Sequence, residues 1–267
     1  MDRFDVSSIV ATHGAPAVVG GTLAALAAGF VAWYMSPFVT LAFSVAKGYA
    51  LSIFLGLPEQ RLLAFVQKNA EKGNAQAVLD CIDRWCWDGQ WMMNIGNRKG
   101  EILDQAVKDA QPMNCVELGG YVGYSAIRIG RLLPKGAQLV TLEISPKYAR
   151  IAEAMILHAG LEKTCRIVVG DSALNIPKLK EITGKDKIDF AFVDHFKTLY
   201  LRDLKIMESC DLLKSGSVLV ADNVIFPGAP DYLKYVRGLP EVYQSEFHPA
   251  QVEYSTITDG VEVTTRK

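Results

Sequence analysis

Two carboxylates and an amide stand at the ends of two apolar, strand-like segments in the second half of the chain. Asp194 ends segment 188–194, and Asp222 and Asn223 lie at the end of segment 217–222. The carboxyl ends of parallel strands meet at one edge of an open sheet, so these side chains are expected to lie together. Two carboxylates and an amide oxygen suit a hard cation such as Mg²⁺, with water and substrate completing an octahedron. In the alternative interpretation, one acid caps a helix and the other forms a surface ion pair.

Lys197 lies three residues after Asp194 and has the chemistry of a general base. A divalent cation nearby opposes the ammonium charge and favours the neutral amine. A neutral lysine can accept a proton near pH 7. This role depends on the metal site, because an isolated loop lysine is normally just solvated. His195 is expected to be a packed or hydrogen-bonded structural side chain.

The first strand-like segment, 115–118, runs into a glycine-containing loop that precedes a helix-like segment. Gly119, Gly120 and Gly123 would let the backbone approach a ligand closely. Glu143 ends the next strand-like segment, where an acid can bind the two hydroxyls of a ribose. Together these features predict a nucleoside cofactor, although the loop is not GxGxxG, which disfavours a pyrophosphate. The alternatives are glycines that serve only a tight turn and an acid that is merely solvated.

A regular alternation of strand-like and helix-like segments must position these residues. The strand-like segments are 115–118, 138–143, 166–170, 188–194 and 217–222, and the helix-like segments between them are 124–133, 146–159, 172–182 and 200–213. Near-continuous apolar strands alternating with helices indicate a parallel sheet covered on both faces. Segments 241–247 and 261–265 suit a closing antiparallel hairpin, and segments 59–70, 74–85 and 97–110 have helical periodicity.

The composition is that of a globular protein. Half of the 267 residues are apolar and 28 Lys and Arg face 29 Asp and Glu, which excludes a disordered chain and gives no overall field for attracting nucleic acid. No nucleic-acid partner is therefore expected. The five cysteines are odd in number, widely spaced and without a CxxC pair, which argues against a disulfide framework or zinc site and favours a reducing compartment.

The N-terminal part differs sharply from the rest, because no Asp, Glu, Lys or Arg occurs between Gly14 and Ala46. After a short tail, 1–14, the apolar segment 15–35 would be a helix of about 31 Å, close to one hydrocarbon thickness, and is predicted to span a membrane once. Trp33 and Tyr34 at its end are typical of a membrane interface. A signal peptide and a buried core helix are the competing interpretations. Segment 36–57 is an apolar juxtamembrane stretch interrupted by Lys47, either interfacial or embedded.

Charge and small residues give further, weaker expectations for this helix. Basic residues after the span favour a cytoplasmic location for the domain that follows, 58–267. The endoplasmic reticulum and the plasma membrane are the two membranes expected. A stripe of small residues could support a weak dimer, although such spacing also arises by chance in a segment rich in Ala and Gly. The stripe consists of Ala17, Gly21, Ala25 and Gly29.

Six segments in order closely resemble the catechol O-methyltransferase family in its membrane-anchored form. They are WMMNIGNRKGEILD (91–104), VELGGYVGYSAIRIGRLLPKGAQLVTLE (116–143), HAGL (158–161), VDHFK (193–197), LVADNVIFPG (219–228) and VEY (252–254). The resemblance covers roughly residues 58 to 262. It implies a Rossmann-like class I methyltransferase with a mostly parallel seven-stranded sheet, an antiparallel C-terminal hairpin, S-adenosylmethionine and Mg²⁺ as cofactors, and a small catechol as substrate.

The resemblance also implies a role for each matching residue. The cofactor would contact Ile95, Glu117, Gly119, Tyr121, Ser125, Glu143, Ile144, Ser172 and Asp194. The metal would be held by Asp194, Asp222 and Asn223, and the substrate would meet Lys197, Asn223, Glu253, Trp91, Met93, Phe196 and Pro227. Among these, Lys197 would deprotonate the catechol, Glu253 would bind its other hydroxyl, and Glu143 would hold the ribose.

Some positions depart from the family pattern. Phe196 stands where the family has Trp, and Asp171 and Ala173 replace a small residue and an amide. Segments 200–204 and 226–230 are shared with a sister family, the transmembrane O-methyltransferase, which lacks much of the metal set kept here. We therefore expect a membrane-tethered enzyme. The alternatives are a catalytically weak, methyltransferase-like binding or trafficking protein and a methyltransferase of other vicinal diols, such as flavonoid or caffeoyl compounds.

Overall fold

The computed structural model describes residues 15–267, without the side chains of 15–28, Tyr34, Tyr49, Ile53 and Phe54. The predicted tail, 1–14, lies outside the described residues. The chain divides after Ala42 into an N-terminal unit and a unit that runs from Phe43 to Lys267. Each is described separately below.

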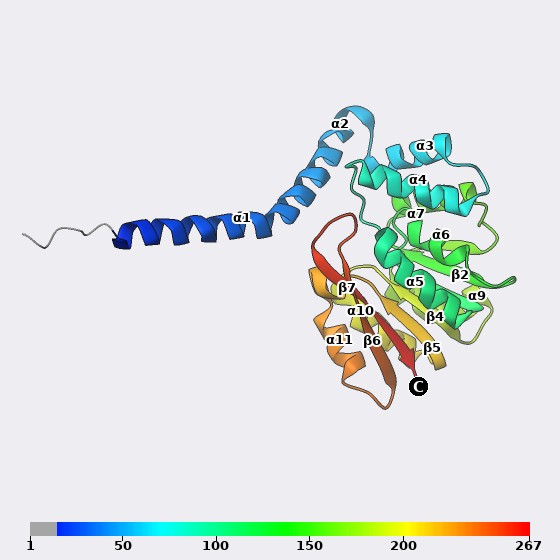
Figure 1. Ribbon diagram of the computed structural model, residues 1–267. Helices are drawn as coiled ribbons and strands as arrows, with labels where there is room; N and C mark the ends of the chain where they lie inside the picture. The colour runs from blue at the N-terminus through cyan, green and yellow to red at the C-terminus, as the bar shows by residue number, and fades with distance from the viewer. Residues whose placement is uncertain (1–14) are drawn as a thin grey trace, which may run out of the picture. The chain divides into compact units, whose positions relative to one another are not determined.

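The second unit is built on one seven-stranded sheet of order β3-β2-β1-β4-β5-β7-β6 (Figure 1). The strands are β1 (Asn114–Leu118), β2 (Gln138–Glu143), β3 (Cys165–Val169), β4 (Ile188–Val193), β5 (Leu213–Ala221), β6 (Tyr243–Gln251) and β7 (Thr258–Arg266). Strands β1 to β5 are parallel, whereas β7 is antiparallel to both β5 and β6. The predicted class I methyltransferase fold is confirmed.

Helices cover both faces of this sheet, as predicted. One core joins the sheet to α3 (Pro58–Asn69), α4 (Ala75–Trp87), α5 (Gly96–Ala110), α6 (Tyr124–Gly130) and α7 (Pro146–His158). A second core joins the other face to α9 (Leu179–Thr183), α10 (Tyr200–Ser209) and α11 (Pro230–Arg237). The central strand β1 is buried at all five positions, including the polar Asn114 and Glu117.

The helices differ from the prediction in two places. The expected helix 172–182 is three short pieces, α8 (Ser172–Asn175), the 3₁₀ turn η1 (Ile176–Lys178) and α9, because Pro177 supplies no backbone N–H for a continuous helix. Helix α11 was not predicted. It begins with Pro230, which suits a first helical turn, and it buries Tyr232 and Val236.

Near the N-terminus, the predicted span 15–35 and juxtamembrane stretch 36–57 share one helix, α1 (Ala15–Ala50), which continues through Pro37 and precedes α2 (Ser52–Leu55). Among the residues of α1 whose side chains are described, the segment Gly29–Gly48 is long and apolar enough to cross a membrane, with 20 residues and a mean hydropathy of 1.4. Length and composition alone identify it, so the membrane span and its limits stay a prediction.

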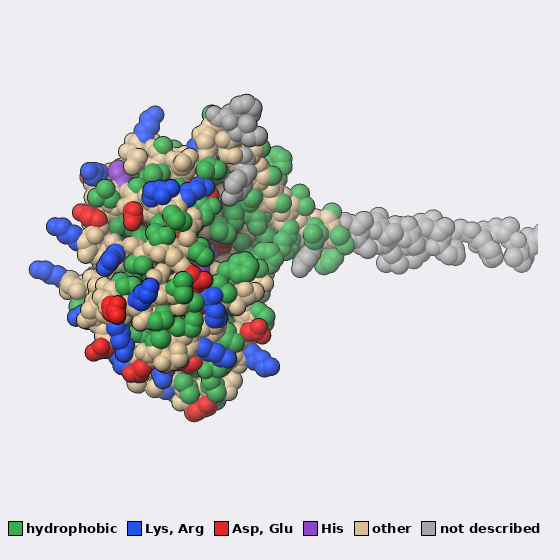
Figure 2. All heavy atoms as spheres, turned by 180° about the vertical axis from the view of Figure 1, so that it is seen from behind, with side chains coloured by type: hydrophobic (Ala, Val, Ile, Leu, Met, Phe, Trp, Pro, Cys, Tyr) green, Lys and Arg blue, Asp and Glu red, His purple; other side chains and the backbone are tan. Residues whose placement is uncertain are grey.

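All five cysteines lie in the second unit as free thiols. Cys81, Cys86, Cys115 and Cys165 are buried free thiols, and Cys210 is a partly exposed one. On the face shown in Figure 2, Lys and Arg side chains are interspersed with Asp and Glu side chains over the second unit.

Candidate active site

Strand register brings the two predicted acidic ligands together. Val193 of β4 pairs with Ala221 of β5, so the residues that follow, Asp194 and Asp222, leave the sheet side by side. The backbone N–H of Asp222 donates to the Val193 carbonyl at 3.1 Å, which continues the ladder to this point. The carboxyl ends of β4 and β5 therefore place both carboxylates at one rim, as the sequence predicted.

The predicted base also lies at this rim. Lys197 Nζ donates to Asp194 Oδ1 and to Tyr200 Oη, each at 2.7 Å. Tyr200 Oη in turn donates to the carbonyl of Asp222 at 3.1 Å. The amine is thus tied to both predicted acidic ligands, one directly and the other through a tyrosine that is fully buried.

Asp222 offers an oxygen to a cation. Its side chain is buried, and Oδ1 accepts no hydrogen bond within residues 15–267, since Lys99 Nζ, 2.9 Å away, lies outside the angles of one. No three His, Cys, Asp or Glu side chains in that described range group as a metal site. The predicted set instead combines Asp194, Asp222 and the amide of Asn223, oxygen donors of the kind that Mg²⁺ accepts together with water. The residues present therefore fit that ion.

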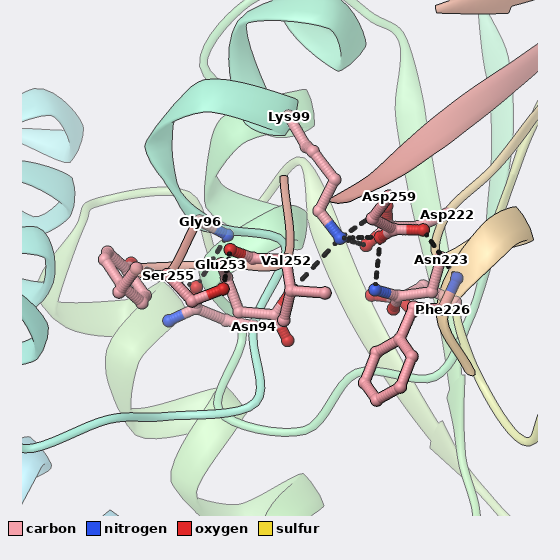
Figure 3. Close-up of polar contacts among 12 residues, drawn as sticks. Asn94, Gly96, Lys99, Asp222, Asn223, Phe226, Val252, Glu253, Ser255 and Asp259 are labelled. Carbon is pink, nitrogen blue, oxygen red and sulfur yellow. Dashed lines mark hydrogen bonds and ion pairs between the residues drawn. The ribbon is translucent and has the colours of Figure 1, made fainter. Parts of the chain in front are cut away.

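Lys99, on α5, was not singled out from the sequence; its side chain reaches toward Asp222 and Asp259 (Figure 3). Its buried Nζ is within hydrogen-bond distance of Asp222 Oδ2 (3.0 Å), Glu253 Oε2 (3.1 Å) and Asp259 Oδ2 (2.9 Å). Burial lowers the pKa of Lys99, but these three carboxylates more than offset it and raise the pKa above its usual value. Burial, reinforced by Asp194, raises the pKa of Asp222 against the pull of Lys99.

Asp259, at the start of β7, was also missed. Its Oδ2 accepts from Asn223 Nδ2 at 2.8 Å, and its Oδ1 accepts from the backbone N–H groups of Ile225 (3.2 Å) and Phe226 (3.0 Å) (Figure 3). Burial would raise the pKa of Asp259, but Lys99 and backbone donors hold it below its usual value. This carboxylate therefore stays ionised and ties the lysine to the loop after β5.

The predicted ribose acid is fixed by backbone donors. Glu143 Oε2 accepts from the N–H groups of Gly120 and Tyr121, each at 2.9 Å, and Oε1 accepts from Ser145 N at 2.8 Å. A carboxylate oxygen has two lone pairs, so Oε1 keeps one for a ribose hydroxyl. Gly119 has a φ of +97°, and a Cβ there would lie 2.5 Å from the Asp194 carbonyl oxygen, which explains the glycine.

Glu117 provides a second anchor in the glycine loop. Its side chain is buried, Oε2 accepts from Thr141 Oγ1 at 2.5 Å, and Oε1 has no hydrogen-bond partner among the described residues. Burial raises the pKa of Glu117 to about 7. An unpaired buried carboxylate oxygen suits a cationic group of a ligand, such as the ammonium at the methionine end of the predicted cofactor. Ile95 and Ser125 are also buried, whereas Tyr121 donates from Oη to Glu59 at 3.1 Å.

Ser172, one of the predicted cofactor contacts, belongs to a separate hydrogen-bond network. Ser172 Oγ donates to Asp203 Oδ2 at 2.5 Å, and His195 Nε2 lies 2.7 Å from the same oxygen. His195 also stacks on Tyr200 with ring centroids 5.2 Å apart, in line with the structural role expected for it. Ile144 is 70% exposed and offers an apolar surface beside the strand end.

The predicted substrate walls come from three loops. Trp91 Nε1 donates to the Glu253 carbonyl at 3.1 Å, so one wall is fixed to the segment that carries the predicted substrate acid. Met93 and Phe196 are exposed, at 59% and 71%. Pro227 follows Phe226 in the turn Val224–Gly228. A separate hollow of about 490 Å³ beside β3 contains none of the predicted site residues.

Comparison with known proteins identifies the family. The O-methyltransferase family model matches residues 87–233. The chain is 45% identical over 207 residues to the catechol O-methyltransferase of Mus musculus, covering 78% of each chain. It is 48% identical over 203 residues to catechol O-methyltransferase B of Danio rerio, covering 76% of each. The chain belongs to the catechol O-methyltransferase family.

Two further similarities are more distant. The human protein named transmembrane O-methyltransferase is 34% identical over 204 residues, 76% of this chain and 70% of that protein. The solved O-methyltransferase of Bacillus cereus, in complex with SAH, has a TM-score of 0.60 at 23% identity, covering 83% of this chain and 97% of that one. The solved structure supports the fold, whereas the catechol O-methyltransferase family is shown by the curated relatives.

Proposed function

We propose that this member of the catechol O-methyltransferase family transfers a methyl group from S-adenosylmethionine to one hydroxyl of a catechol, with Mg²⁺ held by Asp194, Asp222 and Asn223. The observation that carries the proposal is the 2.7 Å contact of Lys197 Nζ with Asp194 Oδ1, which puts a base directly beside a carboxylate of the cation site. A catechol is a small ring with two adjacent oxygens, so it can meet a base and an acid at once.

In the proposed reaction, Lys197 takes the proton of the hydroxyl that is to be methylated. Asp194 and Tyr200 hold its Nζ at that position. Glu253 accepts a hydrogen bond from the neighbouring hydroxyl and so fixes the orientation of the ring. Mg²⁺, when bound, would act as a Lewis acid that lowers the pKa of the reacting hydroxyl.

The walls of the substrate pocket and the contacts to the cofactor complete the proposal. A phenolate and a sulfonium neutralise each other in methyl transfer, so a dry apolar pocket favours the reaction. Trp91, Met93, Phe196 and Pro227 would form that pocket. S-Adenosylmethionine supplies the electrophilic methyl group, and Glu143 would bind its ribose and Glu117 its ammonium. The remaining predicted contacts to the cofactor are Ile95, Gly119, Tyr121, Ser125, Ile144, Ser172 and Asp194.

A turnover assay on a small catechol panel tests this function. The full chain in detergent is assayed with Mg²⁺ and with excess EDTA, as wild type, Lys197→Ala and Lys178→Ala, the last being an exposed lysine that serves as control. We expect Lys197→Ala to lose roughly 10²- to 10⁴-fold in rate while its affinity for S-adenosylmethionine is unchanged. Full activity in EDTA, or a Lys197→Ala variant at full rate, would refute the proposal.

The same assay distinguishes two alternative functions. A catalytically weak binding or trafficking protein would bind the cofactor but turn over no catechol. The exposed Phe196, smaller than the family's Trp, favours a broader range of vicinal diols, which the same assay detects if flavonoid or caffeoyl compounds are added to the panel.

We also propose that α1 anchors the protein in a membrane as a single span with the catalytic unit in the cytoplasm. The apolar segment Gly29–Gly48 supports this. Carbonate extraction of membranes, followed by protease protection, tests both points: release by carbonate would exclude a span. A weak dimer through Ala17, Gly21, Ala25 and Gly29 stays a prediction, to be tested by Gly21→Leu in a crosslinking assay.

A further inference from the structure

A single carboxylate outside the proposed catalytic set controls the loop after β5. Asp259 lies on β7, 36 residues from Asn223 along the chain, yet the two side chains are joined by a hydrogen bond of 2.8 Å. Its other oxygen accepts the N–H groups of Ile225 and Phe226. Asp259 is fully buried, so all of these contacts are made away from water, where hydrogen bonds are stronger.

The hydrogen bond to Asp259 determines which way the amide of Asn223 points. A carboxamide has a donor nitrogen on one side and an acceptor oxygen on the other. An ionised carboxylate can only accept, so Asp259 takes the nitrogen of Asn223 and turns Oδ1 to the opposite side. Asn223 itself has a left-handed backbone with a φ of 53°, and it follows directly after Asp222. The amide oxygen of Asn223 therefore faces away from Asp259.

Lys99 is what allows this carboxylate to remain beside two others. Its Nζ lies 2.9 Å from Asp259, and Asp222 and Glu253 share the same ammonium group (Figure 3). The ammonium group compensates the charge of these three buried carboxylates. Asp259 Oδ2 therefore accepts from two donors, Lys99 Nζ and Asn223 Nδ2, which fixes the carboxylate between the lysine and the amide.

We propose that Asp259, supported by Lys99, is a positioning residue that sets the amide of Asn223 with its oxygen toward the cation site. The inference rests on the proposed metal site. It adds the residue that fixes which end of the Asn223 amide faces the cation. Neither Asp259 nor Lys99 touches the cation in this scheme. Both act through a side chain that does.

Binding of Mn²⁺ alone, measured from the free Mn²⁺ signal by electron paramagnetic resonance on the full chain in detergent, tests the orientation without any turnover. Asp259→Asn keeps the acceptor for the loop N–H groups but presents an amide nitrogen to Asn223, which must then turn its own nitrogen toward the cation. We expect Asp259→Asn to weaken Mn²⁺ binding by about 10- to 100-fold, the usual effect of removing a residue that orients a metal ligand.

A matched pair of double variants separates orientation from charge. In Asp259→Asn/Asn223→Asp the new amide donates to the new carboxylate, which still presents an oxygen to the cation, so we expect most of the Mn²⁺ affinity to return. Glu253→Gln/Asn223→Asp has the same net charge, but its new carboxylate faces the carboxylate of Asp259. We therefore expect it to bind Mn²⁺ no more tightly than Glu253→Gln alone.

The outcomes are distinct. Equal recovery in both double variants, or an Asp259→Asn variant that binds Mn²⁺ like wild type, would overturn the inference and leave the proposed function intact. Wild type that binds no Mn²⁺ would overturn both. If Asp259→Asn does not fold, the two double variants, which keep the number of hydrogen-bonding groups, still give the comparison.

Discussion

Replacing Lys99 by methionine should destabilise the protein strongly, because it removes the only cation that the described structure places among Asp222, Glu253 and Asp259. Lys99 and these three carboxylates are all buried, with side-chain exposures of 0% for the lysine and at most 5% for the acids. Removing one partner of a buried ion pair typically costs about 3–5 kcal/mol, since the other charge is left uncompensated. For a domain of this size each kcal/mol lowers the Tm by about 2–4 °C, so the expected fall is roughly 6–20 °C.

The assay is thermal unfolding of the full chain in detergent and EDTA, followed by tryptophan fluorescence. Lys108→Met is the matched control, because Lys108 lies on the same helix, α5, but is exposed. Added Mn²⁺ should raise the Tm of Lys99→Met by more than it raises the Tm of wild type, since a bound cation supplies part of the missing positive charge. A Lys99→Met variant that melts within 2 °C of Lys108→Met would refute the reasoning.

Three further predictions concern the rim of the sheet. Burial raises the pKa of Glu117 to about 7, above its unfolded value, so its contribution to stability is present at low pH and is lost as pH rises through 7; urea unfolding from pH 5 to 8 should show a fall that Glu117→Gln lacks. Gly119→Ala puts a Cβ 2.5 Å from the Asp194 carbonyl oxygen at a φ of +97°, and we expect weaker cofactor binding and a loss in unfolding free energy larger than the backbone strain alone. Gly136→Ala is the control for that strain, about 1–3 kcal/mol, because its φ is also positive but nothing lies within 4 Å, and its cofactor binding should be unchanged. Trp91→Phe removes the indole donor to the Glu253 carbonyl, and we expect a higher KM for catechol with little change in affinity for S-adenosylmethionine; an unchanged KM would contradict the proposed wall.

The sheet and its polar rim could be predicted because a change from apolar to polar residues shows where a strand ends. A buried parallel strand is continuously apolar, so the first acid after it, such as Asp194 or Asp222, is visible in the sequence. Strand register then brings together residues that the chain separates. For the same reason the glycine loop and Glu143 were found where the structure has them.

Lys99 and Asp259 were missed for different physical reasons. Lys99 did leave a signal, since it shares a helical face with Ile95, Leu103 and Val107, all buried, and a lysine on an apolar face needs buried partners. Asp259 left none, because its partner Asn223 is reached only through the pairing of β5 with β7. Helix α11 was missed, although Pro230 at its start is well suited to a first helical turn.

The order of the last three strands has a consequence for how the protein matures on the ribosome. Strand β7 enters the sheet between β5 and β6, both of which are synthesised before it. Until β7 arrives, β5 and β6 have no strand between them, and the loop after β5 lacks the carboxylate that organises it. The nascent catalytic unit thus carries an open slot in its sheet from the synthesis of β6 until β7 arrives, and it gains a finished site in the same step that closes the slot.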